Sequence, residues 1–147
     1  HTRSLCDWSS DVCSSDLTSS TAAPSPRAAP CWVALDETSC LLFGGASVGG
    51  GGLHGCSDTW LLELEDKASD SGSSSTVAHW KLLHEDESPR SPPGRNAATL
   101  TPLPSSFTLK DHEDDNESPS SQYFLLSGGW YPFRTTYGDN YVLKVTK

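Results

Sequence analysis

The chain contains one sequence block twice, and this repetition constrains the fold more than any local pattern does. The first copy, residues 41–64, is an apolar run closed by two glycines, then a loop, then an aspartate and a segment of alternating apolar residues. The second copy, residues 124–145, has the same features in the same order. The corresponding residues are Gly44, Gly45, Asp58 and Trp60 in the first copy, and Gly128, Gly129, Asp139 and Tyr141 in the second. Such a block predicts a chain built from similar units rather than one irregular domain.

Alternation with a period of two residues predicts β-strands, and no segment has the 3.6-residue period of a helix. The predicted strands of the first unit are residues 31–35, 40–43, 59–64 and 79–83, and those of the second are 97–101, 123–127 and 140–145. The chain is therefore predicted to be all-β. The loops 46–57 and 130–138 each join the second and third strands of their unit, so we expect them on the same face of the molecule.

With Trp80 and Arg95, the repeated residues resemble the kelch motif. That motif is a strand, Gly-Gly, a loop, an Asp before an aromatic strand, a strand carrying Trp, and Pro or Gly before an Arg that opens the next unit. The resemblance covers about residues 26–147, with Ser127 in place of the aromatic residue that usually precedes Gly-Gly. It implies a partial β-propeller of four-stranded antiparallel blades, one complete and one incomplete.

Physical chemistry favours these residue types at these places. A Gly-Gly pair after a buried strand permits positive φ and close backbone approach, which a Cβ would block. An Asp just before a strand binds backbone N–H groups and fixes the turn. Trp60, Trp80 and Tyr141 are large apolar plates suited to packing between twisted sheets.

Changes in composition divide the chain into three parts. Residues 1–25 are expected to be a non-native or disordered segment. Residues 26–90 are predicted to form the first blade, with a flexible Ser-rich insertion at 66–78. Residues 91–147 are predicted to form the incomplete second blade, with an acidic flexible insertion at 104–122.

We interpret the start of the first part as non-native sequence. Residues 1–17 resemble translated sequencing-adapter read-through, so we exclude them from fold and site reasoning. The chain contains no Met, and we therefore expect it to be a fragment, a processed product or a mistranslated end.

Composition excludes several classes of function. A net charge of −9 argues against a nucleic-acid or anionic-membrane partner, because both require clustered Lys and Arg. No run approaches the roughly 20 apolar residues of a membrane span. The five cysteines include no C-x-x-C pair, which argues against a zinc ribbon or a redox dithiol. We expect a reduced, intracellular protein, cytoplasmic or nuclear, with no metal and no cofactor.

Three weaker motifs favour ordinary structural roles. Residues 50–55 satisfy G-x-G-x-x-G, but an alternating strand follows where a dinucleotide site requires a helix. His54, Cys56 and Cys40 lack the spacing of a metal site or a Cys–His nucleophile, although that alternative stays open. The acidic run 111–117 is expected to be a solvated loop, with a basic partner or nearby serine phosphorylation as the alternatives.

The loop 130–138 is the best candidate for a binding surface. It carries four aromatic residues and an arginine, the residue types favoured at interaction hot spots. The candidate partner-binding residues are Trp130, Tyr131, Phe133, Arg134 and Tyr137. The alternative is that some of them pack against a neighbouring blade.

The resemblance implies a function as well as a fold. We expect a protein–protein interaction module, a scaffold that presents loops to another protein, with no catalytic residues of its own. The alternative is a part of a kelch-containing enzyme or enzyme adaptor, such as an oxidase or sugar-isomerising propeller, a methyltransferase-linked propeller or a ubiquitin-ligase substrate adaptor.

Overall fold

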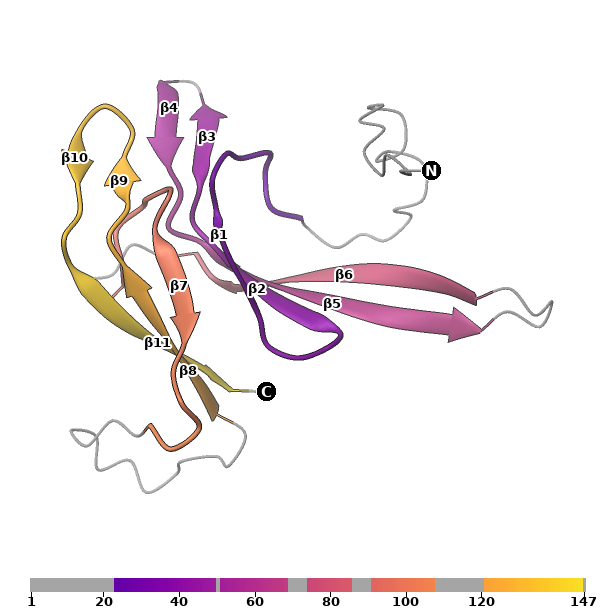
Figure 1. Cartoon of the computed structure of the whole chain (residues 1–147). Helices are drawn as coiled ribbons and strands as arrows, with labels where there is room; N and C mark the ends of the chain where they lie inside the picture. The colour runs from indigo at the N-terminus through magenta and orange to yellow at the C-terminus, as the bar shows by residue number, and fades with distance from the viewer. Residues whose placement is uncertain (1–22, 50, 69–73, 86–90, 108–120, 147) are drawn as a thin grey trace, which may run out of the picture.

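The computed structural model describes residues 23–49, 51–68, 74–85, 91–107 and 121–146, and within them it is all-β with antiparallel pairing and no helix (Figure 1). The all-β prediction is confirmed at this level. The predicted disordered segment 1–25 lies almost wholly outside the described residues.

The first unit forms a four-stranded antiparallel sheet in the order β1-β2-β5-β6. Its strands are β1 (Cys31–Ala34), β2 (Ser39–Phe43), β5 (Thr59–Ala68) and β6 (Ser74–His84). Sequential neighbours pair throughout, so this is a simple meander. A register shift between Thr59 and Trp60 marks a bulge where β5 meets β6.

The second unit forms a three-stranded antiparallel sheet in the order β7-β8-β11. Its strands are β7 (Thr99–Pro102), β8 (Ser121–Ser127) and β11 (Asn140–Thr146). The strand expected from residue 97 begins later, at Thr99. Ala97 has a φ of 52°, a left-handed conformation that differs from the extended backbone of a strand, so strand pairing begins only after it.

The two loops that join second and third strands are hairpins rather than irregular chain. In the first unit β3 (Ala46–Gly49) pairs with β4 (Gly52–Gly55). In the second unit β9 (Trp130–Tyr131) pairs with β10 (Thr135–Thr136). β4 contacts β9, and both hairpins lie at one end of the molecule, at the top of Figure 1. The expectation that these two segments share a face is therefore confirmed.

Where a flexible insertion was predicted at 66–78, the structure has strand at residues 66–68 and 74–78. β2 pairs with β5 only up to Glu63, but β5 and β6 stay in register as far as Ala68 and Ser74. The result is a two-stranded arm that projects beyond the sheet (Figure 1). Residues 69–73 lie outside the described residues.

The acidic insertion predicted at 104–122 is described only at its two ends. Near its start, the N–H of Phe107 donates to the carbonyl of Pro104 at 2.8 Å and closes a turn. At its end, residues 121 and 122 are already part of β8. Residues 108–120, with the acidic run, lie outside the described residues.

The hydrophobic core lies between the two sheets. Its buried members are Cys31, Leu41 and Phe43 from the first sheet, and Leu100, Phe124 and Leu126 from the second. Each of the larger side chains contributes roughly 1.5–3 kcal/mol on full burial. Since β1 contacts β7, the first strands of the two units lie side by side at this core.

Candidate functional site

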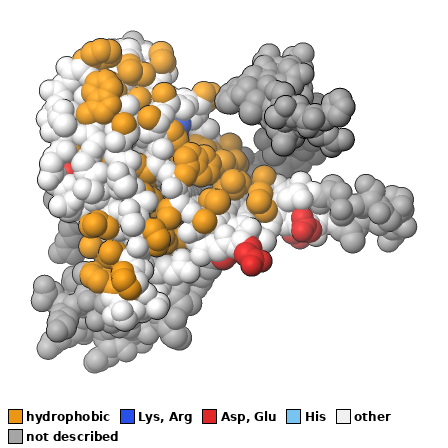
Figure 2. All heavy atoms as spheres, in the orientation of Figure 1, with side chains coloured by type: hydrophobic (Ala, Val, Ile, Leu, Met, Phe, Trp, Pro, Cys, Tyr) orange, Lys and Arg blue, Asp and Glu red, His pale blue; other side chains and the backbone are white. Residues whose placement is uncertain are grey.

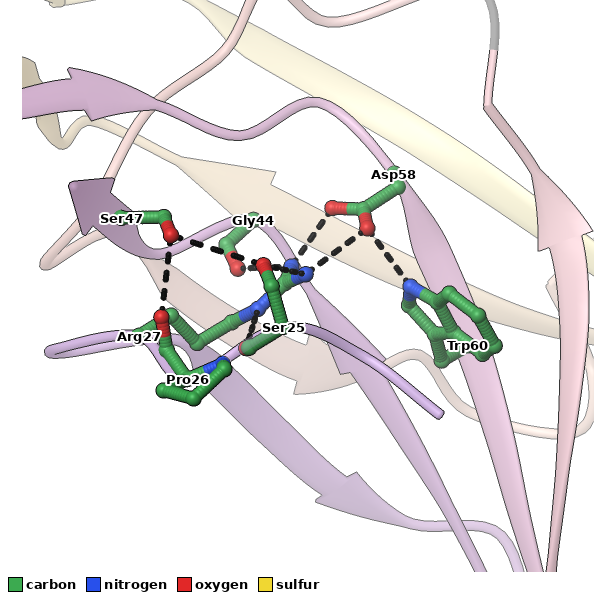
Figure 3. Close-up of polar contacts among 7 residues, drawn as sticks. All are labelled: Ser25, Pro26, Arg27, Gly44, Ser47, Asp58 and Trp60. Carbon is green, nitrogen blue, oxygen red and sulfur yellow. Dashed lines mark hydrogen bonds and ion pairs between the residues drawn. The ribbon is translucent and has the colours of Figure 1, made fainter. Parts of the chain in front are cut away.

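The first unit is closed by an arginine that precedes its first strand (Figure 3). Nη1 of Arg27 donates to the carbonyl of Gly44 at 2.9 Å and to Oδ1 of Asp58 at 2.6 Å. Nη2 donates to Oδ2 of the same carboxylate at 2.9 Å, which makes the ion pair bidentate. The indole Nε1 of Trp60 also donates to Oδ2, at 2.6 Å. The guanidinium thus holds the end of β2 beside the start of β5.

The second unit has the same arrangement. Nη1 of Arg95 donates to the carbonyl of Gly128 at 2.9 Å and to Oδ1 of Asp139 at 2.5 Å, and Nη2 donates to Oδ2 at 3.1 Å. The Arg95 side chain is fully buried. Its guanidinium carbon lies 4.0 Å from the ring centre of Tyr137 and 5.3 Å from that of Tyr141. We call the Arg27–Asp58 and Arg95–Asp139 pairs the two latches.

The backbone around the latches repeats as well. Ala29 and Ala97, each two residues after its arginine, have φ of 47° and 52°. The Gly-Gly pairs match in the same way: φ is 65° and 104° at Gly44 and Gly45, and 66° and 94° at Gly128 and Gly129. The bridges Ala28↔Ala46 and Asn96↔Trp130 occupy equivalent positions. The sequence repeat is therefore a structural repeat down to single dihedral angles.

The latches shift the pKa values of Arg27, Asp58 and Asp139. Burial alone would raise the pKa of Asp58, but the hydrogen bonds from Arg27 and Trp60 outweigh it, so the net pKa lies below the ordinary value. The hydrogen bond from Arg95 likewise lowers the pKa of Asp139. Burial opposes the charge on Arg27, yet its partner Asp58 raises the pKa of the guanidinium overall. Both carboxylates are therefore ionised at neutral pH.

The β9–β10 hairpin carries most of the predicted partner-binding residues. At its tip, Phe133 is 85% exposed and has a φ of 58°, a conformation that costs a non-glycine residue about 1–3 kcal/mol. The Phe133 ring packs edge-on against Trp130, with 6.0 Å between the ring centres. The guanidinium carbon of Arg134 lies 5.3 Å from the ring centre of Tyr131. The hairpin thus presents an aromatic tip with a cation beside it.

Tyr137 takes a different place from the other four candidates. It lies after β10, half-buried, with its ring against the Arg95 guanidinium. Its N–H donates to the carbonyl of Gly129 at 2.8 Å. Tyr137 therefore belongs to the base of the hairpin and supports the second latch.

The neighbouring β3–β4 hairpin adds exposed apolar side chains. Val48 is 80% exposed and Leu53 is 38% exposed, and the two are paired across the hairpin. Figure 2 shows hydrophobic side chains gathered at this end of the molecule, over the two hairpins. We call this combination the hairpin surface; its residues are Val48, Leu53, Trp130, Tyr131, Phe133 and Arg134.

Sequence reasoning omitted Arg27 from the motif residues. Its signal was present, because Pro26-Arg27 precedes the first unit as Gly94-Arg95 precedes the second. Ser25 and Ser47 were also missed. The Ser25 carbonyl accepts from Nε of Arg27 at 3.0 Å, and the Ser47 hydroxyl donates to the Pro26 carbonyl at 3.0 Å. Serines without a motif carry no such signal.

The residues of the weaker sequence motifs lie in strands or are buried as protonated thiols. In the G-x-G-x-x-G segment, Gly52–Gly55 is strand β4. Burial raises the pKa of the Cys56 thiol, and it raises that of Cys31 to about 11, so both thiols are protonated at neutral pH. Cys31 donates to the carbonyl of Ala98 at 3.2 Å. Across the described ranges, no three His, Cys, Asp or Glu side chains gather in a way that would hold a metal ion.

Comparisons with protein-family models, with curated proteins and with solved structures found no match to this chain. In the part of the chain that the structure describes, no helix has the length and apolar character needed to cross a membrane.

Proposed function

We propose that this chain is a pair of kelch-type β-propeller blades whose hairpin surface binds a protein partner. The fold part of the proposal rests on the repeated latch. Each unit has an Arg before its first strand, a Gly-Gly pair after its second and an Asp before its third, and the same hydrogen bonds join them. The four-stranded meander of the first unit is the form that a propeller blade takes.

The exposure of Phe133 is the observation that carries the binding role. A phenylalanine at 85% exposure, held in a left-handed conformation at a hairpin tip, gains little from burial to offset its conformational cost. Trp130 and Arg134 flank it with the residue types that dominate interaction hot spots. The β-hairpin sets these groups on a rigid base, so little ordering entropy is lost on binding.

Site-specific photo-cross-linking in the full protein tests the binding role. A photoreactive phenylalanine analogue at position 133 is expected to form a discrete adduct with one protein, which mass spectrometry identifies. The same analogue at Val142, an exposed position on β11, serves as the matched control and is expected to form no adduct with that protein. Equal labelling at both positions, or none at position 133, would count against the proposal.

The identified partner then permits a quantitative test. Phe133→Ala is expected to weaken binding by about 30-fold, because a hot-spot aromatic contributes about 2 kcal/mol. Val142→Ala is expected to leave the dissociation constant unchanged. Isothermal titration calorimetry measures both, and an unchanged affinity for Phe133→Ala would refute the assignment of the surface.

A further inference from the structure

Strand β6 forms an open edge of the first sheet. Among the described residues it is the last strand in the order β1-β2-β5-β6, and it pairs only with β5. It lies near the middle of the sequence, and part of it runs out along the arm (Figure 1). The outer side of an edge strand presents a row of unpaired N–H and C=O groups to which another extended chain can bind.

The register identifies which backbone groups point outward from β6. The N–H of Leu64 donates to the carbonyl of Thr38 at 2.8 Å, so the backbone groups of Leu64 point away from β6. Leu64 is paired with Ala78. In an antiparallel ladder, the backbone groups of two opposite residues either face each other or both point away. The N–H and C=O of Ala78 therefore point to the open edge, and the same alternation applies to Thr76, Trp80 and Leu82.

The other edge of the arm is protected, and the β6 edge is not. Beyond Glu63, where pairing with β2 ends, residues 65–67 of β5 are Glu, Asp and Lys, all exposed. Charged side chains of this kind are how natural proteins prevent a sheet edge from pairing. Residues 76–82 of β6 contain no proline, and Lys81 is their one lysine. The β6 edge is thus the side of the arm that accepts another strand.

The two faces beside this edge differ in chemistry. Ala78, Trp80 and Leu82 lie on one face, where the Trp80 ring packs edge-on against Trp60 with 6.4 Å between the ring centres. Lys81 lies on the other face, is exposed, and makes no ion pair with a described carboxylate. The side chains of an added strand alternate in the same way. Such a strand fits best with apolar residues on the tryptophan side and an acidic residue opposite Lys81.

We propose that β6 binds an extended segment of a partner protein, which pairs with residues 76–82 as an added strand of the first sheet. The segment has apolar residues at alternate positions and an acidic residue between them, opposite Lys81. A second copy of β6 does not meet this requirement, because β6 contains no acidic residue. The inference uses a different surface from the hairpin surface and does not depend on the proposed function.

Hydrogen–deuterium exchange of the full protein tests the proposal, with the synthetic peptide acetyl-Val-Glu-Val-Thr-Val-Thr-Val-amide as the probe. At saturation the peptide is expected to slow exchange at the amides of Thr76, Ala78 and Trp80 by about tenfold or more, because these N–H groups become hydrogen-bonded. The amide of His79, which points to β5, is expected to change less. Mass spectrometry with fragmentation to single residues measures these rates.

Matched probes separate strand pairing from other modes of binding. N-methylation of the two central valines removes N–H groups that point at β6, and is expected to weaken binding by about tenfold or more. N-methylation of the two threonines removes N–H groups that point away from β6, and is expected to leave the affinity unchanged. A peptide with Lys in place of Glu is expected to bind more weakly, because it sets two cations opposite each other.

A protein variant tests the same edge from the other side. Ala78→Pro removes an N–H that points to the open edge and spares the ladder with β5, and is expected to weaken peptide binding by about tenfold or more. Ala78→Val keeps the N–H and is expected to bind like the unmodified protein. If Ala78→Pro does not fold, the N-methylated peptides still decide the question. Phe133→Ala is expected to leave peptide binding unchanged, so a failure here is distinguishable from a failure of the hairpin surface.

Three results would overturn the proposal. One is unchanged exchange at Thr76, Ala78 and Trp80 at every peptide concentration. Another is equal affinity of the two N-methylated peptides, which would mean that side chains alone hold the peptide. The third is slower exchange at the same amides as the protein concentration rises without peptide, which would assign the edge to a second copy of the chain.

Discussion

At the scale of single residues, the latches explain why an arginine and an aspartate recur in each unit. The Arg27 and Arg95 side chains are 5% and 0% exposed, and a buried guanidinium requires an anion and several acceptors. Asp58 and Asp139 supply the anion, and the carbonyls of Gly44 and Gly128 supply further acceptors. Lysine has no planar fork, so it cannot replace either arginine with the same geometry.

Neutralising a latch is expected to destabilise the fold. Asp58→Asn leaves Arg27 charged and buried without its partner, at a cost of about 3 kcal/mol in the free energy of unfolding. Asp66→Asn on the exposed arm is the matched control, at about 0.5 kcal/mol or less. Urea titration followed by circular dichroism measures both. Equal stability of the two variants would contradict a structural role for the latch.

The latches also predict how stability depends on pH. The pKa values of Asp58 and Asp139 in the folded chain lie below the ordinary value of 3.8 that applies when unfolded. The unfolded state therefore binds protons more readily, so the stabilisation is complete above that value and is lost as pH falls through the folded pKa values. We expect the free energy of unfolding to fall between about pH 5 and pH 2.

The double variant Asp58→Asn with Asp139→Asn is the control for this pH dependence. It is expected to be less stable at neutral pH and to lose less stability on acidification, because its latches have no carboxylate to protonate. Urea titrations across the acid range measure how steeply the free energy of unfolding changes with pH in the unmodified chain and in the double variant. If the two pH dependences are identical, the acid sensitivity comes from other carboxylates.

At the scale of elements, the Gly-Gly pair turns the chain from the sheet into the hairpin. Gly129 has a φ of 94°, and a Cβ there would lie 2.8 Å from Cβ of Ala98 and 3.0 Å from the carbonyl oxygen of Asn96. At Gly44 a Cβ would run into the carbonyl of Arg95. Positive φ and close approach thus coincide at the point where the hairpin surface is attached to the sheet.

Alanine at the Gly-Gly pair is expected to strain this junction. Gly129→Ala should lower the free energy of unfolding by about 1–3 kcal/mol, through both the dihedral angle and the contact with Ala98. Gly138→Ala, at the other end of the same hairpin connection, meets no atom within 4 Å and should be nearly neutral. Thermal unfolding compares the two. Equal destabilisation by the two substitutions would show that the whole hairpin, rather than the Gly-Gly turn, is sensitive to an added Cβ.

At the scale of the whole molecule, the two units share one core and a set of backbone hydrogen bonds. The N–H of Gly45 donates to the carbonyl of Arg95 at 2.9 Å, and the N–H of Arg95 donates to the carbonyl of Cys56 at 3.0 Å. The N–H of Ala97 donates to the carbonyl of Ala29 at 2.9 Å. Neither sheet buries both of its faces, so we expect the units to unfold together.

A core substitution in the second unit tests this coupling. Phe124 is 1% exposed, and Phe124→Ala is expected to cost about 3–5 kcal/mol. Trp32, Trp60 and Trp80 lie in the first unit, so in a Trp130→Phe background tryptophan fluorescence should shift to lower urea together with circular dichroism. Val142→Ala is the control and should shift neither by much. A fluorescence transition that stays in place while circular dichroism shifts would mean that the units unfold separately.

The sequence by itself determined the all-β class, the two-unit organisation and the positions of the Gly-Gly turns, but not the hairpins β3–β4 and β9–β10 or the arm formed by β5 and β6. These features follow from local requirements. Period-two alternation needs only neighbouring residues, and positive φ at Gly44 or Gly128 needs only the residue type. The grouping of Trp130, Tyr131, Phe133 and Arg134 was also predictable, since four residues in one short turn stay together in any fold.

The tertiary structure alone decided which faces are buried and what each latch joins. Leu41 and Leu42 look alike in sequence, yet the register sends Leu41 to the core between the sheets and Leu42 to the opposite face of its sheet, beside Trp60. Arg27 reaches Asp58 across 31 positions, and Tyr137 lies at the base of the β9–β10 hairpin with its ring against Arg95. Pairings of this range depend on how strands align and sheets pack, which local sequence preferences do not specify.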